Sequence, residues 1–405
     1  MIGKLLPLAA VVLVGLYASV SPTRAQTWTL TGASTNGWRS IACSADGTRW
    51  VAGSGIPGTS YGSIYISTNS GATWIQTSAP SNFWFSVASS ADGTRLVAAV
   101  GFSAPGPIYT STDSGATWTS NSAPIANWLS VASSADGTRL AAAAPGSSGG
   151  IYTSTNSGVD WTSNSLPALS WRSVACSADG TKMVAAAYGF TGGIYTSTNS
   201  GTTWSKVSAY IATGRAVACS ADGIPLAVVD GPGTPSFIYV STNFGVSWTA
   251  NTLASHFGQS TGASVAMSAD GTKMVAVAGY IYTSTNSGVS WQTNNLPDEG
   301  WGCVATSADG NRLMVVSAGT ADGLGHIYTT YATSSPSLGI ASAGNDLVLS
   351  WTVPSTNFVL QQNQDLSTTN WTPLTDQPVL NLTNLQNQMF LSSNGSNNFY
   401  RLATP

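Results

Sequence analysis

Two short phrases alternate along this chain, and their regular spacing constrains the fold more than any other feature. The aspartates of the Ser-Ala-Asp-Gly phrase are Asp46, Asp92, Asp136, Asp179, Asp222, Asp270 and Asp309. The Asx residues of the Ser-Thr-Asx-x-Gly-x-x-Trp phrase are Asn69, Asp113, Asn156, Asn199, Asn243 and Asn286. Both series recur at roughly 44 residues, a period typical of repeat proteins made of small, similar units. The chain therefore folds as a stack of near-identical modules.

Each copy reads as four short strands. In residues 171–208, "WRSVACS", "KMVAAA", "GIYTS" and "TTWSKV" are strand-like, and "ADGT" and "TNSG" are turns between them. Charged residues make up only 7% of the chain, against about a quarter in a typical globular protein, a composition that does not suit long soluble helices. Four-stranded antiparallel sheets cannot hide both faces alone, so we expect them to pack radially as the blades of an all-β propeller.

The two ends of the repeat region complement one another. The last copy, "GHIYTTYATSS", lacks the strand that carries Gly-x-x-Trp, but "QTWTLTGASTNGWRS" near the N-terminus parallels "GATWTSNSAPIANWLS" at residues 115–130. We expect the segment around Trp28 to be the outer strand of the last blade, beside the strand near Tyr328. This pairing closes the ring without an open edge and predicts a seven-bladed propeller over residues 26–335.

The phrase "STDSGATW" at residues 111–118 resembles the Asp-box, or BNR repeat, of sialidases and related propellers. The five other copies have Asn in place of Asp. In that family the box is the hairpin turn between the third and fourth strands of a blade. Asn and Asp side chains both accept hydrogen bonds from nearby backbone N–H groups, Gly takes a positive φ, and Trp covers the turn. The phrase is therefore interpreted as structural, and not as a catalytic or calcium-binding motif.

Both termini indicate export. Residues 1–25 are typical of a signal peptide, with Lys4, an apolar stretch from Leu5 to Val20, and a cleavage site before Gln26. A membrane anchor is the alternative, but it needs a longer apolar run. Residues 336–405 contain strand-like runs and resemble a C-terminal β-module of exported bacterial proteins, which predicts an attachment or secretion role. We expect a monomer that is secreted, periplasmic or on the cell surface.

Composition argues against several classes of partner and cofactor. A formal net charge of −3 gives no basic field for phosphates, so nucleic acid is excluded as a partner. The chain has two His and four Cys without His-x-His or Cys-x-x-Cys spacing, which predicts no metal site, and no cofactor is expected. Cys43, Cys176 and Cys219 occupy one repeat position where two other copies have Ser. We interpret them as small buried residues, with a bridge between Cys176 and Cys219 as the alternative.

Departures from the repeat point to a binding site. The position at the start of each innermost strand is occupied in turn by Arg39, Phe85, Leu129, Arg172, Arg215, Ala263 and Gly302. Arg39, Arg172 and Arg215 could converge on a central funnel and hold a carboxylate or sulfate, with His256 on the same loop face. Sialidases resemble this in their arginine triad. The alternative is three unrelated arginines that are solvated or stacked on Trp38 and Trp171.

An enzymatic reading requires further residues. Retaining sialidases use a Tyr nucleophile with a partnering Glu and an Asp acid/base, for which Tyr210, Glu299 and Asp298 are the candidates. The stretch from Gly37 to Ser40 lacks the proline that follows the family's first arginine. The sequence therefore favours a non-catalytic binding or assembly platform for a glycan or protein, with an exo-acting glycoside hydrolase of sialidase type as the alternative. Photosystem II assembly factors and the sortilin ectodomain are similar propellers that bind proteins.

Two more sets of residues recur in every or nearly every blade. Trp38, Trp84, Trp128, Trp171 and Trp301 precede or begin the innermost strands and could stack on sugar rings, although their recurrence favours packing. A row of cations follows the Asp-Gly turns on the opposite face, where its regularity suggests solubility: Arg49, Arg95, Arg139, Lys182, Lys273 and Arg312.

Overall fold

The computed structural model describes residues 27–56, 60–102, 104–146, 149–189, 191–208, 211, 214–230, 236–253, 262–294, 296–297, 299–319, 324–331, 338–343, 346–352, 359–365, 367–382, 385–392 and 398–403. All regular elements in these residues are β-strands. No helix long and apolar enough to cross a membrane is found among them. The expected signal peptide, residues 1–25, lies outside the described residues.

The described strands between Thr29 and Tyr331 form seven four-stranded antiparallel sheets. Their innermost strands are β2 (Trp38–Cys43), β6 (Trp84–Ser89), β10 (Ser130–Ser133), β14 (Ser170–Cys176), β18 (Gly214–Cys219), β22 (Ala263–Met267) and β26 (Trp301–Thr306). The second strands are β3 (Trp50–Ile56), β7 (Leu96–Val100), β11 (Leu140–Ala144), β15 (Met183–Tyr188), β19 (Leu226–Asp230), β23 (Met274–Ala278) and β27 (Arg312–Ser317).

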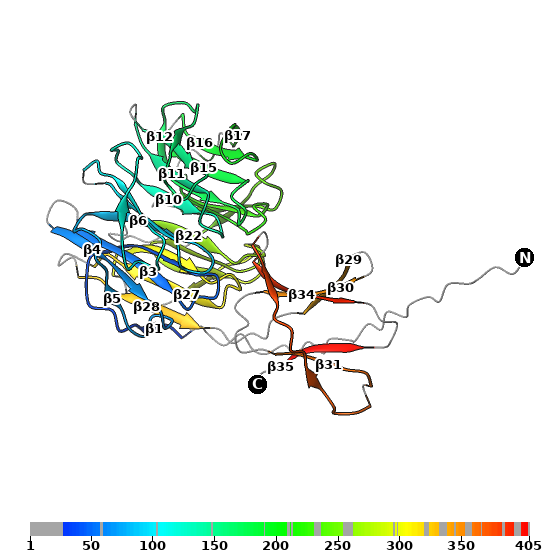
Figure 1. Ribbon diagram of the computed structural model, residues 1–405. Coiled ribbons are helices and arrows are strands. Elements are labelled where there is room, and N and C mark those ends of the chain that lie inside the picture. Colours follow the sequence, from blue (N-terminus) through cyan, green and yellow to red (C-terminus); the bar gives the residue numbers. More distant parts are fainter. Residues whose placement is uncertain are drawn as a thin grey trace, which may run out of the picture.

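The two outer layers of strands complete these sheets. The third strands are β4 (Ser60–Ser67), β8 (Ile108–Ser111), β12 (Gly150–Ser154), β16 (Gly193–Ser197), β20 (Phe237–Ser241), β24 (Tyr280–Ser284) and β28 (Ile327–Tyr331). The outermost strands are β5 (Ile75–Gln76), β9 (Thr119–Ser120), β13 (Thr162–Ser163), β17 (Ser205–Ser208), β21 (Thr249–Thr252), β25 (Gln292–Asn294) and β1 (Thr29–Leu30). Innermost strands of successive sheets contact one another, and β26 contacts β2, so the sheets surround a common axis as in a β-propeller (Figure 1).

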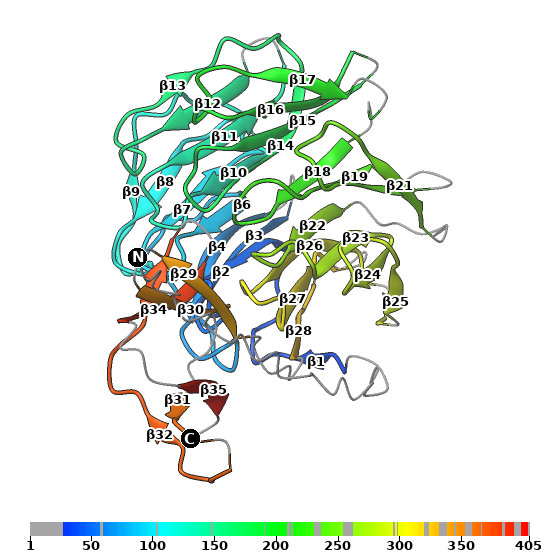
Figure 2. The same ribbon diagram turned by 90° about the vertical axis from the view of Figure 1, so that its right-hand side faces the viewer.

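The N-terminal strand completes the last sheet. β1 pairs with β28 through Thr29 opposite Thr329 and Leu30 opposite Tyr328, so the sheet order is β1-β28-β27-β26. Figure 2 shows β1 at the outer edge of β28. Trp28 packs into the same apolar cluster as Trp301 and Tyr328. The pairing expected from the sequence is present, and it covers the edge of β28 that would otherwise be unpaired.

A closed ring of backbone hydrogen bonds joins the sheets around the axis. Each alanine of the Ser-Ala-Asp-Gly phrase donates its N–H to the carbonyl of the corresponding alanine in the next sheet, at 2.7–2.8 Å. The alanines of this closed ring are Ala45, Ala91, Ala135, Ala178, Ala221, Ala269 and Ala308, and the Ala308 N–H donates to the Ala45 carbonyl. We call this the alanine ring. It satisfies backbone N–H and C=O groups at the centre of the ring, where the side chains are small.

The Ser-Thr-Asx-x-Gly-x-x-Trp phrase forms the turn between third and fourth strands. In the copy with Asn, Asn199 Oδ1 accepts a hydrogen bond from the Thr203 N–H at 2.9 Å. In the copy with Asp, Asp113 Oδ1 accepts the same bond from the Thr117 N–H, also at 2.9 Å. The residue before Gly has a positive φ in every copy, 60° at Ser114 for example, which the sequence did not reveal. Amide and carboxylate therefore support the turn in one geometry.

The C-terminal residues form two further sheets beside the ring. One has the order β29-β30-β34-β33 and the other β32-β31-β35. Their strands are β29 (Gly339–Ala343), β30 (Asp346–Thr352), β31 (Val359–Asn363), β32 (Thr372–Pro373), β33 (Val379–Asn381), β34 (Gln386–Ser392) and β35 (Phe399–Ala403). Leu349, Trp351, Leu360 and Met389 are buried between them. We call this the C-terminal module. Figure 1 shows its orange and red strands to one side of the ring.

Candidate functional site

β-bulges position the three arginines that the sequence singled out. The pairing of innermost and second strands shifts register between Trp38 and Ser40, between Trp171 and Ser173, and between Gly214 and Ala216. The extra residue at each shift is Arg39, Arg172 or Arg215. A bulge re-aims the side chain that it inserts. The fold thus directs these arginines toward the axis instead of into the packing between sheets.

A cavity of about 670 Å³ lies at this end of the axis, which we call the funnel. All seven positions compared in the sequence line it: Arg39, Phe85, Leu129, Arg172, Arg215, Ala263 and Gly302. Below them the wall is formed mainly by valines and serines of the innermost strands. Most of these serines already accept an inter-sheet hydrogen bond, such as the 3.1 Å bond from the Val174 N–H to Ser130 Oγ. No carboxylate is among the described residues that line the funnel.

Two of the arginines share one aromatic ring. The guanidinium carbons of Arg172 and Arg215 lie 5.6 and 5.3 Å from the centre of the Tyr188 ring. Burial, and then repulsion by Arg215, lowers the pKa of Arg172. Arg172 Nε is buried and has no hydrogen-bond partner within the described parts of the chain. Like charges held this close create a site that favours negative charge.

Arg39 stands apart from this pair. Its Nε donates a hydrogen bond to the Gly55 carbonyl at 3.2 Å, and its guanidinium lies 5.8 Å from the centre of the Phe83 ring. Burial lowers the pKa of Arg39. The structure therefore brings all three arginines to the funnel but pairs only Arg172 with Arg215. Their aromatic partners are Tyr188 and Phe83, and not the preceding tryptophans that the alternative reading suggested.

An aromatic stack stands beside Arg39. The rings of Phe85 and Phe102 are parallel, with centres 5.2 Å apart and an interplanar angle of 2°, and Phe83 lies against both. Phe102 is 49% exposed and has a φ of 67°, a strained conformation for a bulky residue that often marks a functional position. The sequence comparison missed Phe102, which follows β7 in a connection whose length differs between repeats, and Tyr188, which is the last residue of β15.

One buried carboxylate lies behind the arginine pair. Asp230 ends β19 and accepts a 2.7 Å hydrogen bond from the Phe237 N–H. Burial raises the pKa of Asp230, while that hydrogen bond and the charge of Arg215 act in the opposite direction. Asp230 is 8% exposed. The charge of Asp230 therefore compensates part of the charge of Arg215.

Glu299 belongs to a different cluster. Its carboxylate accepts hydrogen bonds from Ser317 Oγ at 3.0 Å and from Tyr328 Oη at 2.7 Å, and it lies 2.8 Å from His326 Nδ1. Burial, followed by this hydrogen bond and the charge of Glu299, raises the pKa of Tyr328 to about 12. A raised pKa is the reverse of what activates a tyrosine as a nucleophile. Among the described residues, the tyrosine that donates a hydrogen bond to Glu299 is Tyr328.

Three other candidates cannot be placed. Tyr210, His256 and Asp298 lie outside the described residues. The five tryptophans considered for sugar stacking are described, and all are at most 2% exposed. They pack between sheets, as Trp171 does in one apolar cluster with Ala143 and Ile151 of the preceding sheet. Trp171 also makes an edge-on contact with Tyr195 of its own sheet, with ring centres 5.0 Å apart. These tryptophans are therefore core residues and not a binding surface.

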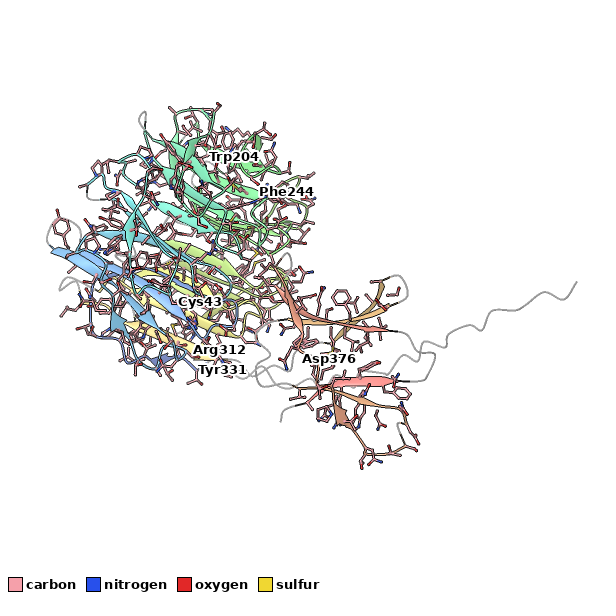
Figure 3. The ribbon with its side chains drawn as sticks, viewed as in Figure 1. Cys43, Trp204, Phe244, Arg312, Tyr331 and Asp376 are labelled. Carbon is pink, nitrogen blue, oxygen red and sulfur yellow. The ribbon has the colours of Figure 1, made fainter. Side chains whose placement is uncertain are left out.

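The cysteines are isolated thiols. Cys43, Cys176, Cys219 and Cys303 are all free, so the bridge considered between Cys176 and Cys219 is absent. Burial raises the pKa of Cys176 to about 12. Cys43 lies among the innermost strands (Figure 3). No group of three potential metal ligands is present among the described His, Cys, Asp and Glu residues.

The cations on the opposite face connect neighbouring sheets. Arg49 Nη1 donates a 2.8 Å hydrogen bond to Ser114 Oγ in the next sheet, and Arg95 Nη1 donates one of 2.6 Å to Ser157 Oγ. Arg312 makes the equivalent bond to Ser70 and lies against Tyr331 (Figure 3). The four arginines of the row each bond to a serine of the neighbouring Ser-Thr-Asx-x-Gly-x-x-Trp turn, and Lys182 and Lys273 bond to the carbonyls of Asp222 and Asp309 in the next Asp-Gly turn. These bonds connect the sheets in addition to any contribution of the row to solubility, which stays a prediction.

Comparisons with known proteins show the fold. No protein-family model matches the chain, and no curated protein matches its sequence. Several solved structures, however, match its fold. The β-propeller domain of Cps50 (Swd1) from Myceliophteria thermophila has a TM-score of 0.56 at 13% identity, over 76% of this chain and 100% of that one. A structure of YCF48 bound to D1 peptide has a TM-score of 0.54 at 14% identity, over 78% and 99%. YCF48 from Cyanidioschyzon merolae has 0.51 at 15% identity, over 76% and 98%.

Proposed function

We propose that this protein is a non-catalytic binding platform that holds an acidic segment of a protein partner in the funnel. The observation that carries the proposal is the pair of guanidiniums of Arg172 and Arg215 on the Tyr188 ring. The funnel wall offers them no carboxylate among its described residues. A carboxylate from a partner would receive forked, charge-assisted hydrogen bonds from this pair.

The remaining wall favours a peptide over a glycan. Sugars are held by many hydroxyl contacts, but most serines of the wall already hydrogen-bond to the neighbouring strand. The exposed face of Phe102 and the valines below it suit apolar side chains. The structure of YCF48 with a D1 peptide, whose fold is similar, gives a precedent for peptide binding by such a propeller.

We further propose the finer features of the fold and the location. The seven sheets over residues 26–335 are the blades of one Asp-box propeller of the sialidase-like kind, and residues 336–405 are a module for attachment or secretion. The chain acts outside the cytoplasmic membrane, secreted, periplasmic or on the cell surface, as the composition of residues 1–25 suggests. The arginines then meet extracellular or periplasmic partners.

An exo-acting glycoside hydrolase of sialidase type has less support. Such an enzyme requires a Tyr and Glu pair and an acid at the sugar. Glu299 is bound to Ser317, His326 and Tyr328, and it is not among the residues that line the funnel. Among the described residues, the funnel therefore has the three arginines but no carboxylic acid that could act as a catalytic acid.

The experiment is a binding comparison on synthetic arrays. Peptides with acidic residues next to aromatic or aliphatic ones, their Asn and Gln counterparts, and neutral and sialylated glycans are probed with the wild type and with the double variant Arg172→Ala and Arg215→Ala. We expect binding to acidic peptides, and a loss of at least about tenfold per arginine, since one charge-assisted hydrogen bond contributes about 1.5–3 kcal/mol.

The matched control is Arg401→Ala. Arg401 also stacks on an aromatic ring, 4.3 Å from the centre of Trp371, but it belongs to the C-terminal module. This variant should bind as the wild type does. Retention of acidic-peptide binding by the double variant, or binding to glycans alone, would contradict the proposed function.

A further inference from the structure

The opposite end of the axis holds a second, smaller cavity of about 160 Å³. Its wall consists of the alanine ring and of the ends of the innermost strands, including Cys43 and Cys176. One lining residue, Leu385, comes from the C-terminal module. The cavity lies on the side of the Asp-Gly turns, whereas the funnel lies where the innermost strands begin.

Leu385 lies on the axis of the ring. It packs with Ala45 and Ala308 in one apolar cluster and with Ala135, Ala178 and Ala221 in another, and Ala91 and Ala269 belong to both clusters. These alanines come from all sides of the alanine ring. A single side chain can touch all of them only from the centre. Leu380 of β33 packs beside Ala45 and Ala308 and supports the same contact.

The backbone of Leu385 has a strained conformation. Leu380 pairs with Asn387 and Asn381 with Gln386, so Leu385 belongs to the tip of the β33–β34 hairpin. Its φ is 54°, in the left-handed region that disfavours side chains larger than glycine. A leucine persists in such a conformation only where its surroundings compensate for the strain. Here the compensation is the burial of its side chain among the alanine methyl groups.

The alanine ring is suited to receive one aliphatic side chain. Because the ring alanines satisfy one another's N–H and C=O groups, their methyl groups are available for apolar contacts at the axis. A leucine fits among these methyl groups without leaving an unpaired polar atom.

The propeller and the C-terminal module also border a larger cavity. A cavity of about 640 Å³ lies between them, lined by Asp46, Asp92, Trp351 and Met389 among others. Asp376, labelled in Figure 3, lines it from the side of the module. Leu385 and Leu380 of the hairpin therefore supply the apolar contact with the alanine ring, and the boundary is open where this cavity lies.

We propose that the alanine ring is an interaction surface for one specific occupant, the β33–β34 hairpin of this chain, and that Leu385 is an intramolecular plug. The plug closes the axis at the Asp-Gly end and leaves the funnel accessible from its own end. It also fixes the C-terminal module on the face opposite the funnel, so a ligand and the module are held without competition. This inference is independent of which ligand the funnel binds.

The test uses the full chain with Leu385→Gly. Glycine favours a positive φ, so the hairpin keeps its shape while the plug is removed. Small-angle X-ray scattering should show a larger radius of gyration than the wild type, because the module is no longer held. Limited proteolysis should separate propeller from module at least about tenfold faster. Leu382→Gly is the matched control, since Leu382 lies on the same hairpin and is 40% exposed.

A variant on the other partner keeps the proposal falsifiable. Ala178→Val narrows the ring, and its scattering and proteolysis should change in the same direction as those of Leu385→Gly while far-UV circular dichroism stays that of the wild type. If both variants keep the radius of gyration and the cleavage rate of the wild type, the plug is refuted. If Leu382→Gly detaches the module as readily as Leu385→Gly, the hairpin and not the plug holds the module, and the proposal is also overturned.

Discussion

At the scale of single residues, repeated and unrepeated positions have different roles. Equivalents of Trp171 and Asn199 recur because most blades share the same core and the same turn, and the structure shows both residues in those roles. Arg172 and Phe102 depart from the repeat and line the funnel. Internal comparison found the arginine because the strands around it align. It missed the phenylalanine because the loop that carries it has no counterpart of equal length.

The Asp-box turn gives a prediction at this scale. Asn199→Asp should change the free energy of unfolding by less than about 0.5 kcal/mol, because Asp113 makes the equivalent bond at the same distance. Asn199→Ala should lose about 1 kcal/mol, since the Thr203 N–H then lacks its partner. Urea denaturation followed by tryptophan fluorescence measures both. Equal stability of the alanine variant and the wild type would show that the side chain does not support the turn.

At the scale of elements, the Asp-Gly turns are held by their own side chains. Asp136 Oδ1 accepts hydrogen bonds from Ser134 Oγ at 2.6 Å and from the Thr138 N–H at 2.9 Å. Burial alone would raise the pKa of Asp136, but these bonds outweigh it and leave the pKa below its ordinary value. Asp92 and Asp179 show the same balance. The turns that connect innermost and second strands thus depend on ionised carboxylates.

A pH dependence of stability follows from these turns. The folded pKa lies below the unfolded value of about 3.9, so the stabilisation is complete above that value and is lost as pH falls through the folded pKa. The urea midpoint should therefore be constant from about pH 7 to 5 and fall below about pH 4. The triple variant Asp92→Asn, Asp136→Asn and Asp179→Asn should show a smaller fall. A midpoint that does not change between pH 5 and 3 would contradict this account.

At the scale of the whole molecule, the ring is closed by residues from both ends of the repeat region. β1 covers β28, and the alanine ring joins the first sheet to the last. An open ring would expose a strand edge and the apolar faces of two sheets, which promotes association. The two ends of the axis are then distinct, with arginines at one and Leu385 at the other.

Removal of the closing strand tests this arrangement. A chain that lacks the residues before Ala33 should melt at a lower temperature and form oligomers in size-exclusion chromatography, because the edge of β28 is then unpaired. A Thr29→Ala variant is the control, because β1 is retained and the Thr29 side chain is exposed. A truncated chain that remains monomeric with the melting temperature of the wild type would show that the strand does not close the ring.

The sequence by itself determined the repeat, the four strands of each copy, the turn chemistry and the pairing of β1 with β28, because each depends on local patterns that recur along the chain. Only the tertiary structure decided which of the residues that differ from the repeat contact one another. It stacks Arg172 and Arg215 on the Tyr188 ring and hydrogen-bonds Glu299 to Tyr328. It also packs Leu385 against the alanine ring. These contacts join different connections, blades or modules, and their geometry depends on bulges and loops that no periodic pattern encodes.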